Sequence, residues 1–282
     1  MTRSMRRRLI VSSRRAMFWT AVLLALAIVV FPIFWLFLSS LKTKLQIDSR
    51  TPLFIFEPSF VNYVDVFQRT DLARFLFNSV IVAGGTTALA LLIGPPAAYG
   101  LTRFRFPGAE TFLAGVLLTR MFPAVAIGMP LYLIASNLKI MDTLPLLIAA
   151  KTSGILPLTI WLMTGFFARI PTDLDDAARA DGCSWFGAYR RVVLPLTAPG
   201  LAATGILAFL YGWNELFFPL TLGPDRARTG PVFIILYIDA TIQVSWGSVA
   251  AGAMVLIVLP LVLGFVAQRY LVDALTAGAV KG

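Results

Sequence analysis

The chain has 282 residues, of which 58% are hydrophobic and 13% are charged, and its mean hydropathy is +0.82. Water-soluble domains carry about 45–50% apolar and about 25% charged residues. This composition therefore excludes a soluble globular protein and predicts an integral membrane protein. The chain has no histidine and a single cysteine, Cys183, which excludes histidine-based catalytic pairs and metal sites and an internal disulfide.

The positions of the basic residues argue against a nucleotide-binding loop and against a nucleic-acid partner. None of the five lysines follows a glycine, so the phosphate-binding loop G-x-x-x-x-G-K-[ST] is absent. A net charge of +10 could indicate a nucleic-acid partner. However, basic residues gather directly before an apolar run, as they do beside a cytoplasmic membrane anchor. They are Arg3, Arg6, Arg7, Arg8, Arg14 and Arg15.

Six apolar runs are long enough to cross a hydrocarbon core about 30 Å thick, which takes about 20 helical residues. Backbone polar groups must be satisfied within lipid, and the runs lack strand-type alternation, so they predict helices. The expected fold class is all-α, a polytopic membrane protein with six transmembrane helices. Their ranges are 17–41, 72–101, 112–135, 144–167, 200–222 and 248–268.

The first run has an alternative interpretation, because a basic stretch followed by apolar residues is also typical of a secretory signal peptide. Its apolar part is about 25 residues long, whereas a signal core has about 7–15. Residues 39–42 also match a small-x-small cleavage site poorly. We therefore expect a retained membrane helix.

Counts of lysine and arginine predict the orientation. With the N-terminus inside, the inside segments carry 14 of these residues and a net charge of +8, and the outside segments carry 8 and a net charge of +1. The positive-inside rule then places both termini in the cytoplasm. We expect three parts: residues 1–71 with the N-terminal tail, the first helix and an external segment; residues 72–268 with five helices and a cytoplasmic loop at 168–199; and a cytoplasmic tail at 269–282.

The long cytoplasmic loop is the most informative segment. Thr172 and Asp175 have the spacing of a capping box, and Gly182 suits the left-handed position that ends a helix. A second short helix can start at Ser184 and must stop by Pro195. The alternative is an amphipathic loop lying on the lipid surface. The two helices are expected to show a small-residue face of Leu174, Ala177 and Ala178 and an aromatic face of Trp185, Phe186, Tyr189 and Val192.

This loop resembles the EAA loop of ABC-importer permeases, whose usual pattern is E-A-A-x-x-D-G-A followed by an aromatic residue, a β-branched residue, L-P and a further proline. Residues 176–183 (DAARADGC) match its first half. The chain departs from the pattern with Asp176 for Glu, Cys183 for Ala and Tyr189 for Phe. The spaced match over 24 positions is specific, and its second half consists of Tyr189, Val192, Leu194, Pro195 and Pro199.

Other segments are similar to the carbohydrate branch of this family, to which the smaller permease subunit of the maltose importer belongs. They are FNS at 77–79, RFPG at 105–108, WNE at 213–215, QRY at 268–270 and LTAGAVKG at 275–282. The resemblance covers nearly the whole chain and implies the type I ABC-importer permease fold.

The resemblance implies a transport subunit rather than an enzyme, in the inner membrane of a prokaryote. It would pair with a second permease and two ATP-binding subunits, and an external solute-binding protein would deliver a sugar or related polyhydroxyl solute. ATP and Mg would bind the partner subunits, with no cofactor in this chain. The implied ATPase-coupling residues are Asp176, Ala177, Ala178, Asp181, Gly182, Tyr189, Leu194 and Pro195.

Within this set, Asp176 is expected to carry the coupling charge toward a basic group on the ATPase. The alternative is that Asp176 only stabilises the N-terminus of its own helix, which is worth a few tenths to ~1 kcal/mol.

The charged residues Arg120, Lys151 and Glu215 lie inside predicted spans. A charge at mid-bilayer costs at least ~2.5–3.5 kcal/mol, so each should face the protein interior or water. At ~1.5 Å per residue, Lys151 and Glu215 fall at similar depth, which permits a pair. Two interpretations stay open: these residues and Asn214 line the substrate pathway, or they form a polar lock between helices.

Two other classes of protein are possible in principle. A secondary carrier driven by an ion gradient would be expected to contain inverted repeats and membrane carboxylates, but the chain shows no convincing repeat and only Glu215 within a span. A membrane-embedded enzyme would lack catalytic groups. The substrate itself stays open among sugars, polyols and glycerol-phosphate-type solutes.

Overall fold

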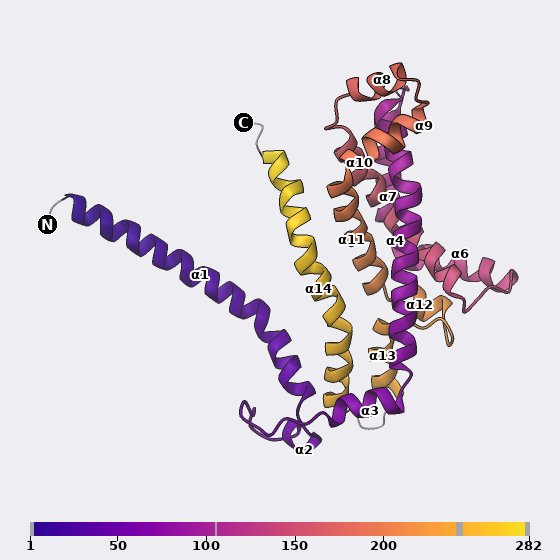
Figure 1. The fold of residues 1–282 in the computed structure, drawn as a ribbon. Helices are drawn as coiled ribbons and strands as arrows, with labels where there is room; N and C mark the ends of the chain where they lie inside the picture. Colours follow the sequence, from indigo (N-terminus) through magenta and orange to yellow (C-terminus); the bar gives the residue numbers. More distant parts are fainter. Residues whose placement is uncertain (1–2, 105, 241–244, 280–282) are drawn as a thin grey trace. The chain divides into compact units, whose positions relative to one another are not determined.

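The computed structural model describes residues 3–104, 106–240 and 245–279, and every regular element within them is a helix (Figure 1). Four helical segments are long and apolar enough to cross a membrane: Arg14–Ser40, Leu72–Arg103, Leu144–Phe167 and Trp246–Val266. Two helix pairs pass the same test together but are bent by 85° and 80°. With the bent pairs included there are up to six candidate spans, and the prediction of an all-α membrane fold is confirmed.

The chain divides into two compact units, and the first comprises Met1–Thr70 and Ala240–Val255. It contains α1 (Arg3–Ser40), α2 (Lys44–Ile47), α3 (Val61–Arg69) and the start of α14 (Trp246–Ala279). The last carbonyls of a helix have no partner within it, and Asn62 on α3 supplies one at the end of α1. Its side-chain amide donates to the carbonyls of Ser40 and Lys42, at 2.9 and 2.7 Å.

The second unit comprises Asp71–Asp239 and Leu256–Gly282. The elements of the second unit are α4 (Leu72–Arg103), α5 (Ala109–Leu118), the 3₁₀ turn η1 (Thr119–Met121), α6 (Ala124–Asn137), α7 (Leu144–Phe167), α8 (Asp173–Ala180), α9 (Trp185–Ala188), the π-helical turn η2 (Tyr189–Val193), α10 (Leu194–Leu196), α11 (Ala198–Asn214), α12 (Phe217–Leu222), α13 (Gly230–Ala240) and the rest of α14. Helices α4 and α7 run in the same direction, and α11 returns in the opposite direction beside them (Figure 1).

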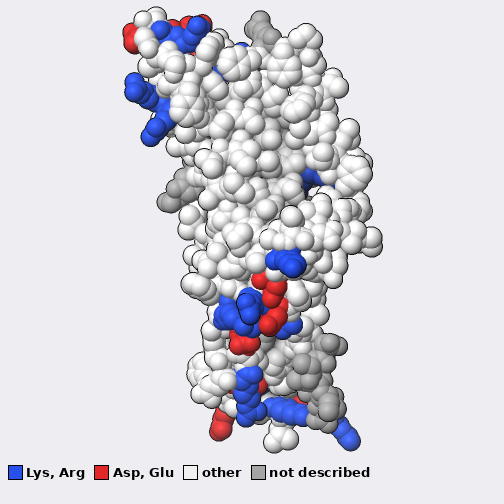
Figure 2. Space-filling view, turned by 90° about the vertical axis from the view of Figure 1, so that its right-hand side faces the viewer, with Lys and Arg blue, Asp and Glu red and all other residues white. Residues whose placement is uncertain are grey.

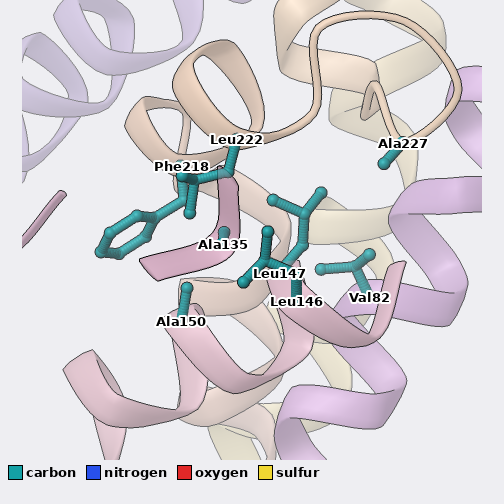
Figure 3. Packing of buried hydrophobic residues seen from close by; sticks show 8 residues of the cluster. All are labelled: Val82, Ala135, Leu146, Leu147, Ala150, Phe218, Leu222 and Ala227. Carbon is teal, nitrogen blue, oxygen red and sulfur yellow. The ribbon is translucent and has the colours of Figure 1, made fainter. Parts of the chain in front are cut away.

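Several apolar clusters hold this unit together. One of them joins α4, α6, α7 and α12 (Figure 3) and contains Val82, Ala135, Leu146, Leu147, Ala150, Phe218, Leu222 and Ala227. Another lies where α4 and α7 end, and contains Ala98, Tyr99, Ile160, Met163, Phe167, Tyr189 and Val193. Lipid tails are as apolar as these side chains, so close packing rather than removal from water stabilises them.

The third predicted span, 112–135, is not one continuous helix. The chain leaves the helix at Phe122, whose ψ is 126°, and α6 starts after Pro123 at an angle of 85° to the preceding segment. A proline has no N–H for the helix and disfavours the helical conformation of the residue before it. The third predicted span is therefore bent at Pro123, and the break opens inside the span.

The fifth predicted span, 200–222, is interrupted as well. Helix α11 ends at Asn214, Glu215 is extended with ψ 124°, and α12 begins at Phe217. The Glu215 carboxylate accepts hydrogen bonds from the backbone N–H groups of Phe217 and Phe218, at 2.7 and 3.2 Å. A side chain that satisfies the first N–H groups of a new helix favours a helix start at that point, so α12 begins anew and does not continue α11.

At the end of the second unit opposite α8 and α9, Asp142 holds the loop that follows α12. Asp142 lies in the α6–α7 connection with φ 60°, and its carboxylate accepts the backbone N–H groups of Asp225, Arg226 and Ala227 at 3.1, 2.8 and 3.0 Å. Burial alone would raise the pKa of this carboxyl, but the three donors and the charge of Arg226 outweigh burial and lower it.

The same loop is held from α4 by the residues predicted to open the second span. The Asn78 amide donates to the carbonyls of Arg226 and Arg228, both at 2.8 Å, and Ser79 Oγ accepts from the N–H of Gly230 at 2.7 Å. These contacts join the segments predicted to be external, 136–143 and 223–230, at one end of the unit.

Most charged side chains on the face shown in Figure 2 lie at the end where α8 and α9 lie and in patches farther down. The surface between them is largely uncharged, with one basic patch. This is the distribution expected of helices that cross a hydrocarbon layer, because a charge within it is costly.

Candidate functional site

The loop 168–199 folds into two short helices joined by a glycine elbow, as predicted. Gly182 has φ +89°, the left-handed region that a glycine enters without steric cost. The N–H groups of Gly182 and Cys183 donate to the carbonyls of Arg179 and Ala178, both at 3.0 Å, and so close the end of α8. Ser184 then starts α9, because its Oγ accepts the N–H of Gly187 at 3.1 Å.

The predicted capping box at the start of α8 is wrong. The Thr172 side chain makes no capping hydrogen bond, and Asp175 turns inward and is 1% exposed. Its carboxylate accepts hydrogen bonds from the Tyr99 hydroxyl at 2.5 Å and from Arg103 Nε at 2.7 Å. A buried charged partner outcompetes a local cap because hydrogen bonds to ionised groups are the stronger kind.

Arg103 extends this contact to the end of α7. Its guanidinium also donates to the carbonyls of Phe167 and Ile170, at 3.3 and 3.0 Å. The side chains of Arg103 and Asp175 are only 4% and 2% exposed. We call Tyr99, Arg103 and Asp175 the loop clamp, because they fasten α8 to the ends of both α4 and α7.

The loop clamp was not found by sequence analysis. Arg103 contributed only to the count of basic residues, and Asp175 was assigned to a cap. The only local signals are a tyrosine and an arginine one helical turn apart on α4, and their partner lies 72 residues after Arg103. A single sequence does not show such a long-range pairing.

The second short helix differs from its prediction. Tyr189 is buried against Tyr99 and Phe167, whereas Phe186 is 66% exposed, so the expected aromatic face is divided between two sides. The helix also continues past Pro195 to Leu196. The π-helical turn before it accounts for this, because the N–H of Leu194 bonds to the carbonyl of Tyr189 and the i−4 ladder that a proline would break is already interrupted.

The outer side of the loop carries the other residues implied by the EAA resemblance. Asp176 Oδ1 lies 3.8 Å from Arg179 Nη1, and the side chains of Asp176 and Arg179 are 69% and 45% exposed. The Arg179 guanidinium covers the Trp185 ring at 4.2 Å. Ala177, Asp181 and Pro195 are exposed, Leu194 is half-buried, and Ala178 and Tyr189 are buried. The expected small-residue face is therefore divided as well, because Ala178 packs against the chain itself.

The four candidate residues of the substrate pathway divide into a largely buried pair and two exposed residues. Lys151 is fully buried, and its ammonium donates to the backbone carbonyls of Gly212 and Glu215, both at 2.8 Å. It also lies 3.7 Å from the Glu215 carboxylate, so the permitted pair forms and links α7 to the end of α11. Arg120 and Asn214 are instead exposed, Arg120 at the break before α6 and Asn214 at the break after α11.

Residues 87–276 match the family described as binding-protein-dependent transport system inner membrane component. The chain is 36% identical over 273 residues to the trehalose transport system permease protein SugB of Mycobacterium tuberculosis, covering 96% of this chain and 99% of that protein. It is 37% identical over 255 residues to the sulfoquinovosyl glycerol transport system permease protein SmoH of Agrobacterium fabrum, covering 89% of each.

A solved structure has the same fold. It is a chain of a bacterial ABC transporter involved in the import of the acidic polysaccharide alginate, with a TM-score of 0.76 and 21% identity over 96% of this chain and 98% of that one. The present fold is thus that of an ABC-importer permease. The chain belongs to the family of inner membrane components of binding-protein-dependent transport systems. It is a permease subunit of an ABC importer, and the alternative of a secondary carrier is set aside.

Proposed function

We propose that this permease subunit moves a sugar or related polyhydroxyl solute across the cytoplasmic membrane as one half of a heterodimeric pathway. The relatives named for trehalose and for sulfoquinovosyl glycerol support a substrate that contains a sugar ring. An external solute-binding protein delivers the substrate, and two ATP-binding subunits, which hold ATP and Mg, drive the cycle.

The observation that carries the coupling part of this proposal is the contrast between the two sides of the loop 168–199. Its inner side is fixed by the loop clamp, and its outer side leaves Asp176, Arg179 and Phe186 exposed. A rigid, exposed surface of mixed charge and aromatic character suits docking to another protein. Asp176, Ala177, Asp181 and Gly182 form the contact with the ATPase, while Ala178, Tyr189, Leu194 and Pro195 hold the loop in shape.

The proposed topology follows from the same assignment. The end of the second unit with α8 and α9 faces the cytoplasm, and the loop held by Asp142 faces outward. Both termini are cytoplasmic; residues 1–71 provide the tail, the first span and an external segment, residues 72–268 the permease core, and residues 269–282 a cytoplasmic tail. Arg105, residues 280–282 and the side chains of Arg3, Arg6, Arg7 and Arg8 lie outside the described part of the structure.

Within the membrane, we assign the substrate pathway to the exposed polar residues at the two helix breaks, Arg120 and Asn214. Lys151 and Glu215 support this pathway from behind, since they bind each other and the backbone. This divides the four candidate residues between the two interpretations that the sequence left open.

A matched pair of charge reversals tests the coupling role. Asp173 and Asp176 are both exposed and both lie in the first turn of α8. In the complete importer we expect Asp176→Lys to reduce co-purification of the ATP-binding subunits and ATP-driven sugar uptake by about tenfold or more, because a contact charge is reversed. Asp173→Lys should leave both near the wild-type level. Equal behaviour of the two variants would show that Asp176 does not form the ATPase contact.

A further inference from the structure

A cavity of about 390 Å³ lies at the break between η1 and α6 in the second unit. It lies within the size range of ligand sites, about 300–1,000 Å³. The aromatic rings of Phe122 and Phe218 form part of its wall, and its polar side chains are Thr119, Arg120, Ser153 and Tyr211. Rings beside a few polar groups are the usual surroundings of a bound sugar ring, which has apolar C–H faces and polar edges.

The charge in this cavity is not balanced. Among the residues that the structure describes, Arg120 forms no ion pair, and no Asp or Glu lines the cavity. The nearby Lys151 and Glu215 compensate each other, and the Glu215 carboxylate also accepts two backbone N–H groups. One positive charge therefore remains within a predicted span, where an unpaired charge is costly.

Other groups in the cavity favour an anion as well. The positive end of the 14-residue helix α6 opens here, since Ala124 at its start lines the cavity. The Tyr211 hydroxyl makes no hydrogen bond within the described residues and is free to donate. Gly154 makes room for it, because a Cβ on Gly154 would lie 2.1 Å from the Tyr211 oxygen. Ser153 Oγ donates to the carbonyl of Ala150 at 2.7 Å and keeps its lone pairs for a sugar hydroxyl.

We propose that this cavity is a subsite for a negatively charged substituent on a sugar, a carboxylate or a sulfonate, with Arg120 and Tyr211 as its donors. This inference rests on the proposed function and narrows it: the substrate class becomes acidic sugars. Arg120 determines specificity, because a guanidinium matches the planar, two-oxygen geometry of a carboxylate. Phe122 and Phe218 cover the apolar face of the ring.

The test uses two sugars that differ only at the charged position, D-glucuronate and D-glucose. They are titrated onto the complete importer in lipid nanodiscs, without the external binding protein, and binding is followed by saturation-transfer-difference NMR. We expect glucuronate to bind about tenfold more tightly than glucose, with a preference that weakens as salt is added. Arg120→Gln should abolish the preference, and Arg120→Lys should keep part of it.

The matched control is Lys139→Gln, which removes one positive charge at the other end of α6, where Lys139 is exposed; this variant should keep the full preference. Equal binding of the two sugars by the wild type, as would result if an acidic residue of the second permease neutralised Arg120, overturns the inference. A preference that survives in Arg120→Gln overturns it too.

Uptake measurements separate this inference from the function on which it rests. If the wild-type importer takes up a neutral sugar with ATP but binds glucuronate and glucose equally, the acidic-sugar subsite is refuted and sugar import stands. If the complete importer takes up no sugar of either kind, the proposed function of sugar import is refuted. The NMR titration still decides whether the cavity selects an anion.

Discussion

Two adjacent carboxylates, Asp175 and Asp176, show how strongly position on a short helix determines a residue's role. They differ by one step along α8, yet Asp175 is 1% exposed and the Asp176 side chain is 69% exposed. A step of one residue turns a side chain by about 100° on a helix, which is enough to move it from the inner to the outer side. Their chemistry is the same, so the surroundings alone separate a structural charge from a candidate contact charge.

The loop clamp should be essential for stability. Asp175→Asn leaves the Arg103 guanidinium buried without a counter-charge, and breaking a buried pair in this way costs about 3–5 kcal/mol. We expect the purified importer to melt several degrees lower, as measured by intrinsic fluorescence during heating. Tyr99→Phe removes one hydrogen bond only and should cost about 1 kcal/mol.

Asp173→Asn is the control for this experiment, since it removes the same charge from an exposed position of α8. It should melt with the wild type. If Asp175→Asn also melted with the wild type, the contacts of Asp175 would contribute no net stability.

Asp142 predicts a pH dependence at the opposite end of the unit. Its pKa is held below the ordinary value of about 3.9, so its stabilising effect is complete above that value and declines as the pH falls through the lower pKa of the folded state. Asp142→Asn tolerates the same left-handed backbone and should cost about 1–2 kcal/mol at pH 7.

Melting curves of the wild type and Asp142→Asn between pH 7 and pH 3 check this sign. The difference between them should stay constant down to about pH 5 and shrink below about pH 4. A difference that grows as the solution becomes acidic would contradict it.

At the scale of elements, the glycine elbow is the feature that sequence reasoning predicted best. Gly182 has φ +89°, and a Cβ there would have open space around it, with no atom within 4 Å. The requirement for glycine is therefore conformational and not steric. Substitutions of Gly182 should therefore rank by how readily the new residue adopts the left-handed backbone conformation, and not by the size of its side chain.

Gly182→Val should abolish uptake and stimulated ATPase activity while membrane insertion stays intact, because a β-branched residue strongly disfavours this conformation. Gly182→Asn should keep a substantial part of both activities, since asparagine enters the left-handed region several-fold more often than most residues. Proteoliposome uptake and ATPase assays measure this order. Gly165→Val, at a helical position with equally open surroundings, controls for side-chain bulk, and equal loss in all three variants would refute the conformational explanation.

The helices themselves were predictable as far as they depend on hydrophobic length. Helix α7 has the predicted bounds, and α4 is longer than its prediction by only two residues at its end. The presence of a proline alone does not decide whether a helix breaks, because Pro123 in one span interrupts the helix while Pro157 in another lies inside α7. Which outcome follows depends on neighbouring helices that can satisfy the freed backbone groups, and this information is not local.

The loop clamp and the Lys151–Glu215 pair illustrate the same limit for the candidate site. The Lys151–Glu215 pair was permitted because both residues fall at similar depth in predicted spans. The Arg103–Asp175 pair joins the end of a span to a loop, where no depth argument applies. Sequence therefore predicted the two short helices of the loop 168–199 and permitted the Lys151–Glu215 pair, but it did not predict how the loop is fastened to α4 and α7.

At the scale of the whole molecule, the single cysteine provides a direct test of topology. Cys183 lies at the elbow of the loop 168–199 and is partly exposed. A membrane-impermeant maleimide should label inverted vesicles and leave right-side-out vesicles unlabelled, because the proposed orientation places this loop in the cytoplasm. Bound ATP-binding subunits should reduce the labelling. The variant Cys183→Ala gives the background, and labelling from the outer side would reverse the orientation.

The buried Lys151 also has a consequence for the synthesis of the chain. Its partners in α11 lie 61 and 64 residues later, and translation at about 5–20 residues per second delays them by roughly 3–13 s. During that interval α7 carries a cation whose acceptors do not yet exist. A ribosome that stalls before α11 emerges therefore leaves this charge uncompensated, which makes an unfinished subunit chemically distinct from a complete one.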